Sequence, residues 1–286
     1  MQKKAVRSAH RFQFSERGMH MRYKVDHDFH IHSQLSACSR DPEQSTKRLL
    51  QYAKDNGYER ICVTDHYWDA TVQGASDWYN TQDFDHIAQS LPLPQAQGID
   101  FLFGCESDMD MQKTVGIPAA RYDDFDFIIV PTTHLHMIGF SIQNADTAHA
   151  ARAKMWVERT EHLLNLSLPF HKVGIAHLAC RLIDNRSRSD LLHTISLISD
   201  ADMQRVFANA AQLGVGIELN QSDMSFADHE ADIILRMFRI AKSQGCKFYL
   251  GSDAHHPAAF EKAKDIFERA VTLLDLHESD KFRIGG

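Results

Sequence analysis

The sequence lacks the features that mark several large classes of protein. Its 5 cysteines in 286 residues are widely spaced and form no CxxC pair, which argues against a disulfide framework and suits a reduced, cytoplasmic protein. No stretch approaches the ~18 consecutive apolar residues of a membrane span. Lys and Arg are scattered and the net charge is −7, so nucleic acid is disfavoured as the main partner. These absences leave a globular cytoplasmic protein.

The chain from residue 24 onward alternates short apolar runs with amphipathic segments. We expect strands at 24–32, 60–66, 101–106, 126–133, 173–178, 214–220 and 246–253, with helical patterns between most of them. A nucleotide-binding open sheet would carry a glycine-rich turn after its first strand, and none is present. The repeat therefore predicts an α/β fold, a single domain whose parallel sheet closes into a TIM-like barrel.

The first residues follow a different pattern. Residues 1–22 are rich in basic side chains and lack the apolar core of a secretory signal. We expect residues 1–22 to be a flexible N-terminal extension and residues 23–286 to form the catalytic barrel.

Histidine is abundant, with 18 residues, and many of these lie at expected strand ends. These ends read DFHIH, VTDH, GCE, PTTH, GIAH, IELN and GSDAH. In a βα barrel the carboxyl ends of the strands carry the reactive groups. His30 and His32 share one strand face by the two-residue period, so both imidazoles can bind one ion. The same alternation places Asp28 on the face of the two histidines, where its carboxylate can accept a hydrogen bond from an imidazole N–H. Phe29 then faces the helices.

The ordered motifs DFHIHS, ICVTDH, GCES, PTTH, IAH, IELN and GSDAH resemble the polymerase and histidinol phosphatase (PHP) family over about residues 24–275. The resemblance implies a distorted (β/α)7 barrel that holds up to three divalent metals and hydrolyses phosphoester bonds. It implies a first metal at His30, His32, Glu106 and Asp253, a second bridged by Glu106 and completed by His134 and His177, and a third at His66 and His255.

The third site is where this sequence departs from the family. Relatives commonly supply a histidine or carboxylate a few residues after the HxH pair, whereas this chain has Cys38, followed by Asp41. Asp41 precedes Pro42 and is expected to cap a helix that ends at Gly57, which makes Cys38 the better candidate. Either Cys38 or Asp41 can complete the third site.

Imidazoles and carboxylates with few sulfurs suit Zn, Mn or Fe better than Ca or Mg. With two to three such ions, a metal-bridging hydroxide would attack a small phosphate monoester, histidinol phosphate being one example. Asp65, Asp253 and Asn220 are candidate catalytic residues, the two carboxyl groups as acids and Asn220 as a contact to the substrate. Arg181 and Arg186 are candidate anchors for its phosphate.

Three other functions compete with this one. A phosphodiesterase or exonuclease acting on nucleotides fits the resemblance but not the acidic charge. An amidohydrolase-type enzyme also begins with HxH, but typically supplies a lysine where this chain has His134. A non-catalytic PHP module is disfavoured by the near-complete ligand set. His136 is expected to be a loop residue near the rim, and Glu218 to belong to a buried polar network.

Overall fold

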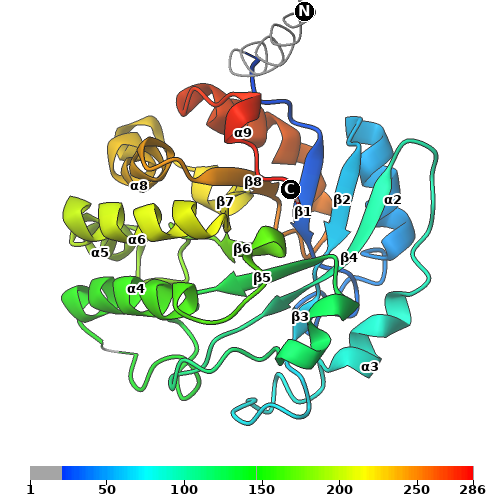
Figure 1. Cartoon of the computed structure of the whole chain (residues 1–286), viewed down its shortest axis with the longest axis horizontal. Helices are drawn as coiled ribbons and strands as arrows, with labels where there is room; N and C mark the ends of the chain where they lie inside the picture. The colour runs from blue at the N-terminus through cyan, green and yellow to red at the C-terminus, as the bar shows by residue number, and fades with distance from the viewer. Residues whose placement is uncertain (1–20, 146, 286) are drawn as a thin grey trace, which may run out of the picture.

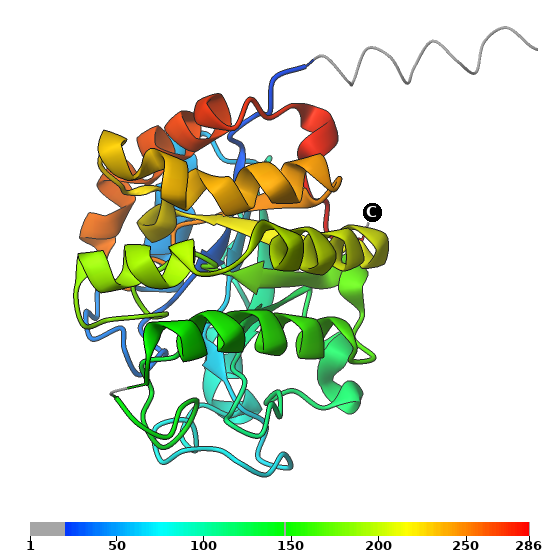
Figure 2. The ribbon, with the colours of Figure 1, turned by 90° about the vertical axis from the view of Figure 1, so that its left-hand side faces the viewer.

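The fold is a nearly closed parallel barrel surrounded by helices (Figures 1 and 2), seen in a computed structural model that describes residues 21–145 and 147–285. Its strands are β1 (His27–Ile31), β2 (Arg60–Val63), β4 (Asp100–Ser107), β5 (Phe127–Pro131), β6 (Val173–Ala176), β7 (Gly216–Asn220) and β8 (Lys247–Gly251), paired in that order. The short β3 (His66–Tyr67) follows β2 and also pairs with β4. The predicted seven-stranded barrel is confirmed, with the expected strand 60–66 broken after Val63.

Two hydrogen bonds bring the first and last strands together. The His32 amide donates to the Ala254 carbonyl over 3.1 Å, and the Asp253 amide donates to the His30 carbonyl over 2.7 Å. The closure therefore lies at the carboxyl ends of β1 and β8, where the polar motifs of both strands are found.

The helices cover the outside of the barrel (Figure 1). They are α2 (Thr46–Asn56), α3 (Phe84–Ile87), α4 (His149–Leu164), α5 (Arg188–Ser196), α6 (Asp200–Leu213), α7 (Gln221–Met224), α8 (Ala231–Ser243) and α9 (Phe260–Leu273). Their apolar faces pack against outward-pointing strand residues such as Ile61, Ile128 and Ile217 in one large core. None of the described helices has both the length and the apolar character to cross a bilayer.

Helix α2 begins later than predicted. Its N-cap is Ser45, whose side chain accepts from the Arg48 amide, so the expectation that Asp41 caps this helix is wrong. Residues 41–44 form a turn instead, closed by the Gln44 amide donating to the Asp41 carbonyl. That turn buries Gln44, whose amide group donates to the carbonyls of His32 and Ala254. The delayed start therefore ties the ends of β1 and β8 together.

Strand β1 breaks the simple alternation assumed from the sequence. Its register against β2 shifts between Asp28 and Ile31, as at a β-bulge. Asp28 consequently points outward and accepts from the Tyr52 hydroxyl on α2, while Phe29 turns inward against Phe127. The predicted orientations of Asp28 and Phe29 were therefore wrong, because a bulge reverses every alternation counted across it.

The amino ends of the strands enclose an aromatic cluster. Phe29, Phe127 and Tyr249 meet inside the barrel, and Phe282 from the C-terminal segment packs against them. Gly174 leaves the space for these rings, because a Cβ there would lie 2.6 Å from both Phe127 and Tyr249. We call the four aromatic residues the base cluster.

The ends of the described chain meet at this base. The Tyr23 amide donates to the Leu276 carbonyl, the Glu278 amide donates to the Met21 carbonyl, and the Phe282 amide donates to the Phe248 carbonyl. The predicted extension 1–22 lies outside the described residues except for Met21 and Arg22.

Candidate metal centre

Three groups of potential ligands converge at the carboxyl ends of the strands. In each group the ligand atoms lie within 4.8 Å of one another. The first group is His30, His32 and Glu106, the second is Glu106, His134 and His177, and the third is His32, Cys38, His66 and His255. The Asp253 carboxylate lies 3.1 Å from His32 Nε2 and 3.5 Å from His30 Nε2, beside the first group. The fold thus brings together every residue that the sequence proposed as a metal ligand except Asp41, the alternative to Cys38.

Glu106 is the centre of the arrangement. Its Oε2 lies 3.0 Å from His66 Nδ1 and 3.3 Å from His32 Nε2, while its Oε1 lies 3.0 Å from His177 Nε2. One carboxylate oxygen therefore faces each side of the cluster. This is the geometry that a carboxylate needs to bridge two ions.

The two histidines of β1 are oriented from behind. Glu218 lies 2.7 Å from His30 Nδ1, and the Ser36 hydroxyl lies 2.9 Å from His32 Nδ1. Each ring is thereby held so that its Nε2 faces the other, at a separation of 3.2 Å. Two buried ring nitrogens this close are readily satisfied by a shared cation, and outer partners of this kind orient metal-binding imidazoles in general.

The histidines of the second group are held in the same way. Asp108 lies 2.5 Å from His134 Nδ1, and the Thr133 hydroxyl lies 2.9 Å from His177 Nδ1. Sequence reasoning missed the roles of both partners and of Ser36. Asp108 could have been found, because it follows Glu106 by two residues, directly after the end of β4.

Two candidate ligands have an unfavourable backbone conformation. His177 has φ 34° and Asp253 has φ 53°, in the left-handed region that costs a non-glycine residue about 1–3 kcal/mol. Hydrogen bonds hold both amides in place, from His177 to Glu218 Oε2 and from Asp253 to the His30 carbonyl, each 2.7 Å long. The surrounding contacts thus impose a strained geometry where two candidate ligands leave their strands.

Cys38 completes the third group on the open side of the cluster. It is the one exposed cysteine among the described residues, and its sulfur lies with nitrogens of His66 and His255. The His66 Nδ1 atom is buried and makes no hydrogen bond to a described residue, its contact with Glu106 Oε2 being an ion-pair approach only. Asp41, the alternative, accepts from the Glu43 amide and lies 2.8 Å from His256 Nε2. The described geometry favours Cys38.

The cluster is strongly polarised by its own charges. Burial would raise the pKa of Glu106, but the histidines around it, His66 and His30 foremost, hold this pKa well below its usual range. Burial would lower the pKa of His30, yet Glu218, Asp253 and Glu106 raise it well above the ordinary value. The site therefore keeps its carboxylates ionised and places them where positive charge is stabilised.

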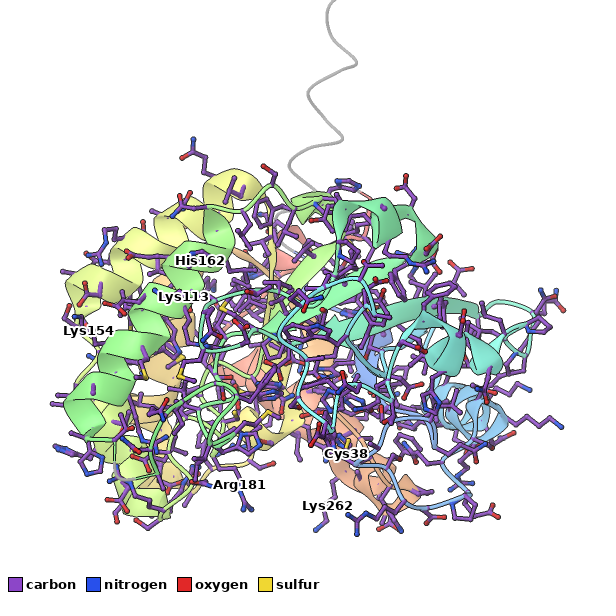
Figure 3. All side chains as sticks on the ribbon, turned by 90° about the horizontal axis from the view of Figure 1, so that it is seen from below. Cys38, Lys113, Lys154, His162, Arg181 and Lys262 are labelled. Carbon is purple, nitrogen blue, oxygen red and sulfur yellow. The ribbon has the colours of Figure 1, made fainter. Side chains whose placement is uncertain are left out.

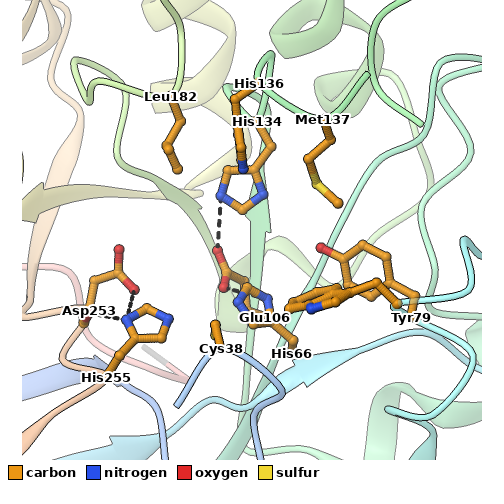
Figure 4. A pocket seen from close by; sticks show the side chains of 11 residues that line it. Cys38, His66, Tyr79, Glu106, His134, His136, Met137, Leu182, Asp253 and His255 are labelled. Atoms are coloured by element: carbon orange, nitrogen blue, oxygen red, sulfur yellow. Dashed lines mark hydrogen bonds and ion pairs between the residues drawn. The ribbon is translucent and has the colours of Figure 1, made fainter. Parts of the chain in front are cut away.

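The cluster opens into a cavity of about 350 Å³, shown in Figure 4. Glu106, His66, His134, Asp253, His255 and Cys38 line one part of it, and Trp78, Tyr79, His136, Met137 and Leu182 line the rest. His136 thus lies at the rim, where the sequence placed it. The loop residues Trp78 and Tyr79 belong to no recognisable motif and were missed.

Of the three candidate catalytic residues, only Asp253 lines the cavity. The Asp65 carboxylate accepts from the Ser33 amide and from the hydroxyls of Ser33 and Ser36, which places it behind His32. Asn220 caps α7 through its Oδ1, and its buried Nδ2 makes no hydrogen bond to a described residue. Asp65 and Asn220 therefore stand one layer away from the cavity.

The two candidate arginines also lie outside this cavity. Arg186 is bonded to Asp184 and His149 in the loop between β6 and α5. Arg181 lines a neighbouring cavity of about 450 Å³ together with Ser252. Figure 3 labels Arg181 and Cys38 in the lower half of the view. Arg181 is thus the better placed of the two for contact with a ligand at the strand ends.

Comparison with known families gives the sequence resemblance an independent basis. A family model for the PHP domain matches residues 28–275. The chain belongs to the PHP domain family. The predicted class of activity is thereby confirmed: this PHP protein is a hydrolase of the phosphoesterase type.

A solved structure shows the same fold. Histidinol phosphate phosphatase from Lactococcus lactis subsp. lactis Il1403, determined with zinc, L-histidinol and phosphate, is similar at a TM-score of 0.55 and 17% identity, covering 86% of this PHP chain and 93% of its own. A probable 2-pyrone-4,6-dicarboxylic acid hydrolase from Acinetobacter baumannii, determined with citric acid bound, is more distant, with a TM-score of 0.40 and 13% identity. The match covers 90% of this chain and 97% of that protein. A comparison with curated proteins gives no match.

Proposed function

We propose that this protein hydrolyses a small phosphate monoester with two to three divalent metal ions of the zinc, manganese or iron type. The observation that carries the proposal is the convergence of His30 and His32, whose Nε2 atoms lie 3.2 Å apart while Glu218 and Ser36 hold the opposite ring nitrogens. When bound, such ions make coordinated water acidic and place positive charge beside the phosphoryl oxygens. The zinc in the Lactococcus structure agrees with this choice of metals.

The donor set divides naturally among these ions. The first would be held by His30, His32, Glu106 and Asp253, the second by Glu106, His134 and His177, and the third by Cys38, His66 and His255, with His32 also within reach. Nitrogen and oxygen donors suit zinc, manganese and iron, and one sulfur at the third position favours the softer zinc.

The residues of the chain divide the remaining work by position. Asp253 lines the cavity, so we propose that its carboxylate contacts the reacting ester. Asp65 acts at one remove, because the Ser36 hydroxyl that donates to it also lies against His32. Arg181 has no carboxylate partner among the described residues and lines the neighbouring cavity, and we propose that it contacts the phosphate of the substrate.

The alternatives are less well supported. A nucleic-acid substrate would favour a basic groove, and none of the described residues that line the cavity is Arg or Lys. An amidohydrolase-type site would have a lysine where His134 lies beside Glu106. Histidinol phosphate stays one candidate monoester, supported by the L-histidinol and phosphate in the Lactococcus structure.

A reduced cytoplasmic setting completes the proposal. The five cysteines form no disulfide within the described part of the chain, and four of them are buried. An exposed thiol beside a metal site is preserved best where thiols stay reduced.

The test is metal analysis of the purified protein together with a panel of phosphate monoesters and diesters. We expect bound metal and monoester hydrolysis in the wild type, and loss of both, with activity reduced at least ~10²-fold, in His32→Ala. His229→Ala, at an exposed position outside the cluster, is the matched control. A metal-free wild type, or an active His32→Ala variant, would refute the mechanism.

The third site has its own test. Replacement of bound metal by Co²⁺ gives a near-ultraviolet charge-transfer band when a thiolate is a ligand. We expect this band in the wild type and not in Cys38→Ser, together with the loss of one metal per chain. If Cys38→Ser keeps its full metal content and the wild type shows no such band, Cys38 is not a ligand.

A further inference from the structure

The part of the cavity that holds no candidate ligand has a chemical character of its own. It is formed by Trp78, Tyr79, His136, Met137 and Leu182, which we call the ester wall. Two of these residues are aromatic, two are flexible apolar side chains, and one is an imidazole. Figure 4 shows Met137 and Leu182 on the His134 side of Glu106 and Tyr79 on another side. The wall therefore faces whatever is attached to a phosphate held at the cluster.

The aromatic half of the wall is fixed in place. The Tyr79 hydroxyl donates to Asp108, the residue that also holds His134, so this ring cannot swing into the cavity. Trp78 packs at 90° to Tyr79 with ring centroids 4.7 Å apart, and at 71° to His66 with centroids 4.9 Å apart. These edge-to-face contacts leave a rigid, half-buried indole beside a candidate metal ligand.

The other half comes from the loop after β5. Met137 is held by its carbonyl, which accepts from the amides of Phe140 and Ser141. His136 has a buried Nδ1 that makes no hydrogen bond to a described residue. The wall thus offers apolar surface and an adaptable thioether beside the His136 imidazole.

Charge is the property that the ester wall lacks. The described lining contains no Arg or Lys, and its only carboxylates, Glu106 and Asp253, are committed to the cluster. A second phosphate or an ammonium group on the alcohol would lose its hydration here without an opposite charge to replace it. The cavity volume of about 350 Å³ also lies at the small end of ligand sites.

We infer that the ester wall selects a compact, flat, uncharged alcohol, so that the preferred substrates are monoesters of aryl or heteroaryl alcohols. This inference rests on the proposed phosphomonoesterase function and adds the class of the leaving group. It ranks aminoalkyl phosphates, histidinol phosphate among them, and nucleoside diphosphates below uncharged aryl esters.

The experiment compares four monoesters: phenyl phosphate has a flat apolar alcohol, cyclohexyl phosphate a puckered apolar one, 2-aminoethyl phosphate a cationic one and glycerol 1-phosphate a polar uncharged one. For the wild type we expect kcat/KM to be highest for phenyl phosphate. In Trp78→Leu we expect the phenyl ester to lose at least ~10-fold in kcat/KM, mainly through KM, with glycerol 1-phosphate almost unaffected. Trp78→Phe restores a flat ring and should recover most of the loss.

Ile138→Ala is the matched control, because Ile138 belongs to the same loop as Met137, is 60% exposed and does not line the cavity. We expect this variant to behave as the wild type with all four esters. Equal kcat/KM for phenyl and 2-aminoethyl phosphate, or a Trp78→Leu variant with unchanged preference, would overturn the inference.

A binding measurement separates this inference from the proposed function. Trp68 and Trp156 are buried, so Trp78 is the tryptophan whose fluorescence a ligand in the cavity can reach. We expect benzyl alcohol to quench the fluorescence of metal-depleted wild type but not of Trp78→Phe, and ethanolamine to quench neither. Quenching without hydrolysis of any ester would refute the proposed function and retain the ester wall. Hydrolysis without benzyl alcohol quenching would do the reverse.

Discussion

The two ends of the barrel interior are built from opposite materials. At the amino ends of the strands, the base cluster fills the interior with four aromatic rings. At the carboxyl ends, the same strands and the loops that follow them supply histidines and carboxylates. The base buries apolar surface, which stabilises the fold, whereas the mouth buries polar groups and holds His177 and Asp253 in strained conformations. The contrast indicates that stability and chemistry are carried by different layers of one barrel.

Of the substitutions that test this contrast, Phe282→Ala in the base cluster is expected to have the largest effect, a loss of stability without a loss of metal. Removing a buried aromatic ring leaves a cavity and typically costs about 3–5 kcal/mol of unfolding free energy. Urea unfolding measures the loss, with Leu273→Ala at an exposed helix position as control. Metal content per folded molecule should stay as in the wild type, because no candidate ligand contacts Phe282. A variant that lost metal but no stability would show that the layers are not separate.

A smaller effect is expected from Glu218→Gln, at the boundary between the layers. Glu218 lies against His30 Nδ1 with one oxygen and accepts from the His177 amide with the other, and an amide cannot replace both oxygens. Loss of such an outer partner typically weakens metal affinity ~10–100-fold. Competition with a chelator measures the affinity, and Glu268→Gln, at a surface pair with Arg22, is the control. Unchanged affinity would mean that His30 is oriented without Glu218.

The smallest effect is expected from the loss of the Asp26 carboxylate, which directly precedes β1 and contributes to stability in a pH-dependent way. Burial would raise the pKa of Asp26, but the hydrogen bond with His27 and the ammonium of Lys281 lower it to about 2. Because the folded pKa lies below the unfolded value of ~3.9, this group stabilises the fold above pH ~4, and the gain disappears as the pH falls towards 2. Asp26→Asn should therefore cost about 2 kcal/mol at pH 7.

Urea unfolding of Asp26→Asn and wild type across this pH range tests the sign. The difference between them should shrink as the pH falls from ~4 towards 2. Asp100→Asn, at a side chain that is 70% exposed, should differ little from wild type at any pH. A gap that grows on acidification would contradict the assignment.

The sequence predicted the mouth of the barrel better than its base. Polar residues at successive strand ends could be recognised because parallel strands bring their carboxyl ends to one rim. The inward turn of Phe29 could not, because the β-bulge in β1 depends on pairing with β2, which local alternation does not contain. The closure by Phe282 depends on contacts between residues far apart in the chain, which no periodicity reveals.

The start of α2 and most of the residues that contact the candidate ligands were also beyond what local sequence patterns can predict. Both Asp41 and Ser45 are acceptable caps, and the choice of Ser45 accompanies the burial of Gln44 between β1 and β8. Asp108 beside His134 follows from strand geometry in hindsight, whereas the approach of Trp78 and Tyr79 to the cluster comes from a loop without a motif. The local sequence pattern predicts which residues lie at the rim, whereas the residues that contact them depend on tertiary structure.

The meeting of the two ends of the described chain at the base has a practical consequence. The Met21 carbonyl accepts from the Glu278 amide and the Phe282 amide donates to the Phe248 carbonyl, so residues 21 and 282 lie at the end of the barrel opposite the cavity. A linker to a solid support, a fluorescent label or a fused carrier protein can therefore be joined at residue 21 or residue 285 with the cavity still facing outward. The same geometry orients an immobilised layer of this protein with every cavity open to the solution.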